Sequence, residues 1–181
     1  NLTARVQRQA AAARQRARTT EALYLFAKKL AGTGTLDDVL WATVFQIASM
    51  LKVQVVILLP EDGSIAVRAA YPPDDELDDA DIAAARWAWD HNRPAGRGAD
   101  TLPGAKRLYL PLRTGRTPIG VVGLDKDGAG PLLTPEQQRL FDALADQAAV
   151  AIERTQLVDD LDRAKLAAEA DRLRSALLTS I

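Results

Sequence analysis

Residues 52–72, KVQVVILLPEDGSIAVRAAYP, decide the fold of this chain. The first part, residues 52–60, is an uninterrupted run of mostly β-branched and aliphatic residues, which is typical of a buried strand. Residues 61–64, EDGS, contain an Asp-Gly pair that favours a tight hairpin turn, and a second apolar run follows in residues 64–72. The stretch therefore predicts a β-hairpin whose first strand is largely buried.

Helical periodicity precedes the hairpin. Residues 1–31 predict one helix that is rich in alanine at first. Thr35 is placed to cap a second helix, because Asp38 stands at the third helical position. Each helix carries an apolar stripe that must face other parts of the protein: Leu23, Phe26, Ala27 and Leu30 in the first, and Leu36, Leu40, Val44, Ile47 and Leu51 in the second.

The chain beyond the hairpin alternates between helix and strand signals. A helix capped by Asp78 or Asp79 and ended by Pro94 precedes a loop at residues 95–105. Residues 106–128 predict two further strands, and Pro111 needs an edge or a bulge because it cannot donate to a ladder. A last helix begins after its cap Thr134, with Pro135 and Gln137 at its first and third positions, and continues to the end of the chain.

This order of elements predicts an α+β domain with an antiparallel sheet of about five to six strands packed against helices, and long helices at both ends. The length of 181 residues and the hydrophobic fraction of 48% suit one packed domain with extensions. The net charge of -1 gives no reason to expect nucleic-acid binding. No run of about 18 apolar residues is present, so the chain as given is not expected to cross a membrane.

Two charge runs stand out against this balance. Residues 1–20 hold Arg5, Arg8, Arg14, Arg16 and Arg18 and no acid. Residues 74–81, DDELDDAD, are almost all acidic, and we expect them to form a solvated loop and the start of a helix, where negative charge is favoured by the helix dipole.

The stretch from residue 87 to residue 107 is the best candidate for a ligand site. Aromatic and cationic side chains surround a glycine-bearing loop there, a mixture that suits a small anionic or aromatic ligand. The alternative is a structural role, in which the first tryptophan belongs to the core, the histidine ends a helix and the arginines satisfy loop carbonyls. The candidate residues are Trp87, Trp89, His91, Arg93, Arg97 and Arg107.

No metal site or catalytic residue is predicted. The chain has no cysteine and a single histidine, His91, so the usual soft ligands are scarce. Residues 125–136, DKDGAGPLLTPE, approach the pattern of a calcium loop, but Ala129 offers no oxygen at the fifth position and a strand stands where a helix is required. We therefore expect neither a metal nor a cofactor in this fragment.

Several of these motifs resemble one known family. Residues 36–40, LDDVL, and 133–154, LTPEQQRLFDALADQAAVAIER, are similar to the helices that flank the sheet in GAF domains. Residues 87–114, WAWDHNRPAGRGADTLPGAKRLYLPLRT, and 118–124, PIGVVGL, more specifically resemble the GAF domain of KdpD-type sensor histidine kinases, which respond to potassium limitation or osmotic stress.

The resemblance implies an organisation for the chain. Residues 1–31 would be a juxtamembrane linker helix, residues 32–153 the GAF domain, and residues 154–181 a signalling helix that leads to the dimerisation and phosphoacceptor domain. Residues 172–181, RLRSALLTSI, are similar to the segment that precedes the phosphoacceptor histidine in that family. We therefore expect the fragment itself to lack kinase activity, and the full-length protein to be an ATP-dependent histidine kinase.

The same resemblance implies partners and a location. It implies a KdpE-type response regulator as the target of the kinase and a cytoplasmic domain next to an inner membrane. A parallel homodimer through the terminal helices is expected on separate grounds, because one small sheet domain cannot fully cover the apolar faces of the first and last helices. The arginines of residues 1–20 agree with the positive-inside rule, although a solvated helix face explains them equally well. A purely structural dimerisation spacer without a ligand is the alternative to a ligand-responsive sensor domain.

The last helix carries two apolar repeats that do not share one register. Leu157, Leu161, Ala164 and Ala168 follow a four-three-four spacing, and so do Leu166, Ala170, Leu173 and Leu177. The second set is offset by two positions within the heptad, so one continuous seam cannot contain both sets. This pattern predicts a segment in which two packing registers compete.

Overall fold

The computed structural model describes residues 1–73 and 76–180. Its strands form one antiparallel sheet in the order β2-β1-β5-β4-β3. The elements in chain order are α1 (Leu2–Ala31), α2 (Leu36–Leu51), β1 (Gln54–Glu61), β2 (Ser64–Tyr71), α3 (Asp79–His91), β3 (Ala95–Gly96), β4 (Leu108–Thr114), β5 (Thr117–Asp125) and α4 (Pro135–Thr179).

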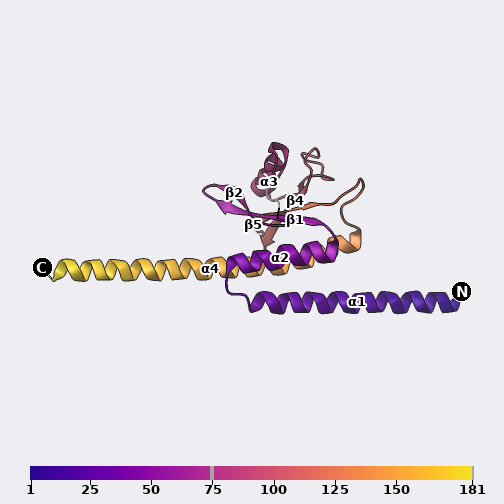
Figure 1. Cartoon of the computed structure of the whole chain (residues 1–181), viewed down its shortest axis with the longest axis horizontal. Helices are drawn as coiled ribbons and strands as arrows, with labels where there is room; N and C mark the ends of the chain where they lie inside the picture. Colours follow the sequence, from indigo (N-terminus) through magenta and orange to yellow (C-terminus); the bar gives the residue numbers. More distant parts are fainter. Residues whose placement is uncertain (74–75, 181) are drawn as a thin grey trace.

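Helices cover both faces of the sheet (Figure 1). The helices α2 and α4 pack on one face, where the apolar stripe of α2 and residues such as Phe141, Leu144 and Ile152 of α4 form the larger core. On the opposite face, α3 contributes a smaller core through Ala84, Ala85 and Ala88. Because both faces are covered, β1 has an almost continuous run of buried residues instead of an alternating pattern.

Local signals placed most of the elements correctly. The hairpin turns at Asp62 and Gly63, whose φ values of 49° and 78° are those of the left-handed region that an Asp-Gly pair favours. The caps are those expected, since Thr35, Asp78 and Thr134 each accept a hydrogen bond from the backbone three residues on. The prediction of an α+β fold with an antiparallel sheet of about five to six strands is confirmed, since the sheet has five strands.

The structure differs from the expectations in the loop before β4. The short strand β3 lies inside the stretch expected to be all loop, and it pairs only with Leu108 and Tyr109. Pro111 lies beyond β3, so its side of β4 is a free edge, as the missing N–H requires. The helix α3 ends before Pro94, at Asn92, whose φ of 52° is left-handed.

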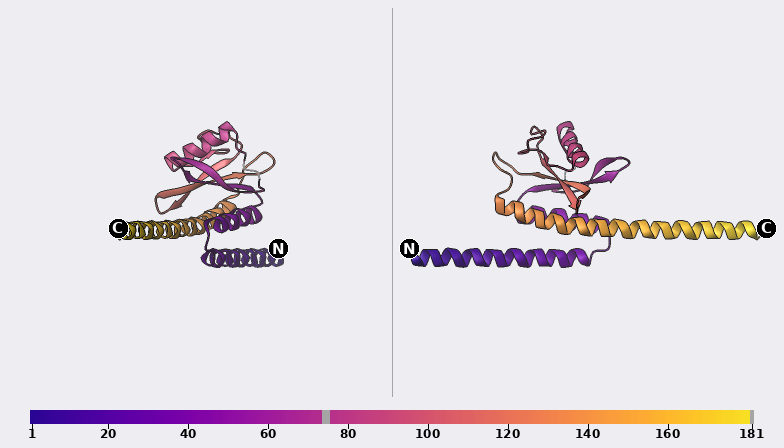
Figure 2. Two further views of the ribbon diagram at one scale, coloured as in Figure 1. Left: turned by 60° about the vertical axis from the view of Figure 1, so that its left-hand side comes forward. Right: turned by 180° about the vertical axis from the view of Figure 1, so that it is seen from behind.

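The terminal helices leave the domain at opposite ends (Figure 2). The helix α1 lies along α4 and runs in the same direction, with Phe26 and Leu30 buried against the larger core. Thr155 is the last buried residue of α4 in the described part of the chain, and nearly all later residues are exposed. Slightly more than half of α4, the part after Thr155, therefore projects beyond the folded domain as a single exposed helix.

Candidate functional site

The six candidate residues do not form one site. Arg97 and Arg107 belong to a polar network at the end of the sheet, whereas Trp87 and His91 stack on each other at the end of α3. Trp89 is half-buried against the smaller core, and Arg93 is exposed just after α3. Whether any of them contacts a ligand stays a prediction.

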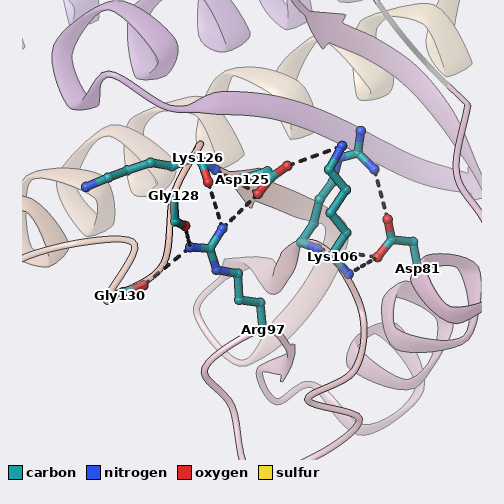
Figure 3. A network of polar contacts seen from close by, with 8 residues as sticks. Asp81, Arg97, Lys106, Asp125, Lys126, Gly128 and Gly130 are labelled. Atoms are coloured by element: carbon teal, nitrogen blue, oxygen red, sulfur yellow. Dashed lines mark hydrogen bonds and ion pairs between the residues drawn. The ribbon is translucent and has the colours of Figure 1, made fainter.

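Asp81 is the centre of the first half of the polar network. Its carboxylate is 1% exposed and accepts hydrogen bonds from the backbone N–H groups of Lys106 (2.9 Å) and Arg107 (3.3 Å). Arg107 Nη1 donates to Asp81 Oδ2 at 2.9 Å, which completes a buried ion pair. Asp81 thus ties the first turn of α3 to the chain segment that enters β4 (Figure 3).

Arg97 organises the second half of the network (Figure 3). Its Nη1 atom donates to Asp125 Oδ1 (2.9 Å) and to the carbonyl of Lys126 (2.8 Å). Its Nη2 atom donates to the carbonyls of Gly128 (2.7 Å) and Gly130 (3.3 Å). Arg97 therefore fastens the loop between β5 and α4 to the loop after β3, a structural role for this arginine.

Lys106 joins the two halves. Its Nζ atom lies 3.6 Å from Asp125 Oδ2, and its backbone N–H donates to Asp81. Asp125 is 3% exposed, so both carboxylates of the network are buried and each faces cations. Such paired charges are costly to separate, because each unpaired partner would remain in a poorly solvated place.

Trp87 and His91 form a stacked pair one helical turn apart. Their ring centroids are 4.2 Å apart with an angle of 13° between the planes. His91 Nδ1 lies 3.0 Å from the Trp87 carbonyl, so this nitrogen carries the proton and donates. The imidazole thus satisfies a carbonyl at the C-terminal end of α3, as the structural alternative supposed.

Tyr109 is a buried polar residue of the sheet that the sequence did not single out. Its ring packs over Gly123, where a Cβ atom would come within 2.7 Å of Cε1. Burial raises the pKa of Tyr109 well above its usual range, and the negative charge of Asp81 adds to this effect. Arg107 opposes this rise of the pKa through its charge and its approach to the phenol, although the hydroxyl has no hydrogen-bond partner of normal geometry among the described residues.

Two cavities lie near these groups, on the α3 side of the sheet and at its end. The first, of about 260 Å³, lies between α3 and the β1–β2 hairpin and is lined by Leu58, Ile65, Val67, Leu77, Ile82 and Arg86. The second, of about 170 Å³, is lined by Gln54, Val55, Val56, Tyr71, Pro72, Lys106 and Arg107. Arg107 is the only one of the six candidate residues that lines either of these two cavities.

Sequence reasoning missed the acidic members of the network. Part of the acidic run, residues 74 and 75, lies outside the described residues. Asp81, at its end, is buried although the run was expected to be solvated. The helical spacing could have predicted this burial. Asp81 shares one face of α3 with Ala84, Ala85 and Ala88, all of which are buried.

Neither a cluster of metal ligands nor a membrane-spanning helix is found in the described part of the chain. Within residues 1–73 and 76–180, no three carboxylate or histidine side chains gather as metal ligands would. Over the same residues, none of the helices combines the length and the apolar character that a membrane span needs.

The fold and the sequence together identify the class of protein. The family model described as "GAF domain" matches residues 35–154, and the chain belongs to the GAF domain family. It is 35% identical over 181 residues to the Sensor protein KdpD of Escherichia coli (strain K12), covering 100% of this chain and 20% of that protein. It is 28% identical over 188 residues to the Sensor protein KdpD of Clostridium acetobutylicum, covering 100% and 21%. The chain thus spans about a fifth of the length of these curated relatives.

Solved structures agree with this assignment. The crystal structure of the native GAF domain of the potassium sensor histidine kinase KdpD from Escherichia coli superposes with a TM-score of 0.66 at 30% identity, covering 78% of this chain and 98% of that one. The GAF domain of a putative sensor histidine kinase from Pseudomonas syringae pv. tomato shares the fold, with a TM-score of 0.60 at 16% identity and coverage of 86% and 98%.

Proposed function

We propose that this chain is the cytoplasmic regulatory domain of a membrane-bound KdpD-type histidine kinase that controls the response to potassium limitation or osmotic stress. The observation that carries the proposal is the 35% identity to a KdpD sensor protein over all 181 residues. This identity includes α1 and the part of α4 after residue 154, both of which lie outside the residues 35–154 of the family match. The relationship therefore extends to the segments that would connect the domain with its neighbours.

In this function, α4 is the output element. Two contacts hold it where it leaves the domain: Thr114 Oγ1 donates to Glu153 Oε2 at 2.6 Å, and Arg154 Nη2 donates to the Leu30 carbonyl at 2.7 Å. The first contact joins α4 to β4 and the second joins it to the end of α1. A shift of the sheet or of α1 would thus act on α4 at the adjacent residues Glu153 and Arg154.

The remaining features of the proposed kinase lie outside this chain. The ATP site, the phosphoacceptor histidine and the contact with a KdpE-type response regulator would belong to the kinase core that follows α4. The arginine-rich start of α1 would lie next to the membrane, and two copies would pair through the terminal helices. The domain itself would regulate and not catalyse.

A chimera tests the proposal. The chain replaces the matching fifth of the Escherichia coli KdpD protein, and autophosphorylation in membrane vesicles is measured at low and high potassium. We expect the response to potassium to be retained. In a second chimera, a helical linker replaces residues 32–153 and leaves α1 and residues 154–181; we expect kinase activity that no longer follows potassium. A normal response of the second chimera would show that the domain is only a spacer, and loss of the response in the first would contradict the proposal.

A further inference from the structure

The cavity of about 170 Å³ at the end of the sheet has a cationic wall. It lies beside the first residues of β1 and the last residues of β2, and both Lys106 and Arg107 line it. Two neighbouring cations that face one small space repel each other unless negative charge lies between or beside them. The charges around the cavity therefore decide what it accepts.

Arg107 has hydrogen-bonding capacity that the protein leaves unused. The side chain is 9% exposed, and only its Nη1 atom has a hydrogen-bond partner among the described residues. The other donors, Nε and Nη2, have no hydrogen-bond partner among the described residues, and neither atom is fully enclosed by the protein. Arg107 is also one of the residues that line the cavity.

The charges of the network do not cancel. Asp81 pairs with Arg107, and Asp125 pairs closely with Arg97 at 2.9 Å. Lys106 is left with a distant contact of 3.6 Å to Asp125, and its side chain is 64% exposed. Within this network of Asp81, Arg97, Lys106, Arg107 and Asp125, three cations face two carboxylates, and Lys106, which borders the cavity, is the cation with the most distant carboxylate partner.

We propose that this cavity binds a small oxyanion of the phosphate type, held by Arg107 Nε and Nη2 and by Lys106 Nζ. A guanidinium edge with two free donors matches two oxygens of such an anion, and an ammonium group adds a mobile point charge. The volume is sufficient for a phosphate group and too small for a nucleotide. The proposal deepens the regulatory function above, because it names the class of ligand that the domain recognises.

Direct titration of the chain tests the site. Binding of inorganic phosphate to residues 1–181 is followed by calorimetry and by nuclear magnetic resonance of backbone amides, with chloride at equal ionic strength as the reference. We expect a dissociation constant on the order of 1 mM, as for a few charge-assisted hydrogen bonds. Shifts are expected at Lys106, Arg107 and Gln54. Glycerol 3-phosphate in a parallel titration distinguishes a phosphate ester from the free ion.

Matched variants make the result specific. Lys106→Gln removes the cation that borders the cavity, and we expect binding to weaken about tenfold, equivalent to about 1.4 kcal/mol. Lys126→Gln makes the same charge change at an exposed residue that does not line the cavity, and binding should be unchanged. Thermal melts check that both variants are folded. Equal weakening in both variants, or no phosphate effect beyond that of chloride, would overturn the site. Neither outcome depends on kinase output, so the proposed function is judged separately by the chimeras.

Discussion

At the scale of single residues, burial separates charges that look alike in the sequence. Asp79 and Asp81 stand in the same acidic run, yet Asp79 is exposed and Asp81 is 1% exposed. The difference arises because Asp78 caps α3 and thereby places Asp81 on its inner face. The cap was predictable from local sequence, whereas the partners of Asp81 come from residues 106 and 107, whose approach depends on the folded sheet.

Asp81→Asn should therefore be strongly destabilising. The change leaves the buried guanidinium of Arg107 without a counter-charge, and breaking such a pair costs about 3 kcal/mol. Urea unfolding followed by circular dichroism measures the loss. Asp79→Asn is the matched control, and its free energy of unfolding should change by less than about 0.5 kcal/mol. Equal stability of the two variants would show that the ion pair contributes little.

Tyr109 predicts a dependence of stability on alkaline pH. Burial raises the pKa of Tyr109 above its ordinary value of 10.0, so the folded protein keeps the phenol protonated where the unfolded chain loses the proton. The folded state then binds more protons, and its stability falls as pH rises above 10. Tyr109→Phe should weaken this fall in urea unfolding midpoints, and near neutral pH it should cost less than about 1 kcal/mol because the hydroxyl has no partner. An unchanged alkaline profile would contradict the expectation.

At the scale of elements, helix ends and the hairpin turn follow from a few neighbouring residues, and these were predictable. The strand β3 was not, because its two residues become a strand only by pairing with Leu108 and Tyr109. The candidate site was predictable only in part for the same reason. Trp87 and His91 lie one turn apart on a helix, so their closeness follows from local sequence, but Arg97 after β3 meets Asp125 of β5 across the intervening strand β4. Contacts between distant segments leave no periodic signal.

The junction between α1 and α4 provides a prediction at this scale. Arg154 donates to the carbonyls of Leu30 (2.7 Å) and Thr33 (3.2 Å) at the end of α1, where the Leu30 carbonyl also accepts from the Thr33 backbone N–H at 3.1 Å. Arg154→Met should loosen the end of α1 and leave the sheet intact, at a cost of about 1 kcal/mol. Hydrogen exchange should accelerate at residues 26–33 and not in β1. Arg163→Met, on the projecting part of α4, is the control, and equal exchange in both variants would refute the coupling.

At the scale of the whole molecule, the projecting helix is incompletely covered. Large apolar side chains along α4 are exposed, among them Val150 (63%), Leu157 (56%) and Leu161 (61%). Val150 lies seven residues before Leu157, so the first apolar repeat reaches back into the folded domain. A lone helix with such a stripe favours pairing with a second copy.

We expect the chain to form a parallel homodimer through this stripe. Sedimentation velocity at high micromolar concentration should show a dimer, because the apolar seam is buried only on association. Leu161→Glu places like charges at the centre of the seam and should shift the population to monomer. The control is Ala167→Glu, at an exposed residue that lies in neither repeat, and this variant should remain a dimer. A monomer at all concentrations would exclude this assembly.

The offset between the two repeats of α4 leads to a prediction about signalling. One seam uses Leu157, Leu161 and Ala168, and the other uses Leu166, Leu173 and Leu177, so a pair of helices cannot bury both in one register. Alanines dominate the overlap, and few apolar contacts then distinguish the two registers. A domain upstream could therefore shift their balance with a few kcal/mol.

Ala168→Leu adds a large apolar side chain to the first seam alone and should stabilise that register by about 1 to 2 kcal/mol. In the full-length kinase proposed above, autophosphorylation should then stay near one level whatever the stimulus, because the second register is rarely reached. Ala167→Leu adds the same side chain outside both seams, and the kinase should keep its response. A stimulus-dependent response in Ala168→Leu at normal expression would reject the two-register switch, since the added contact could not then have changed the balance that output follows.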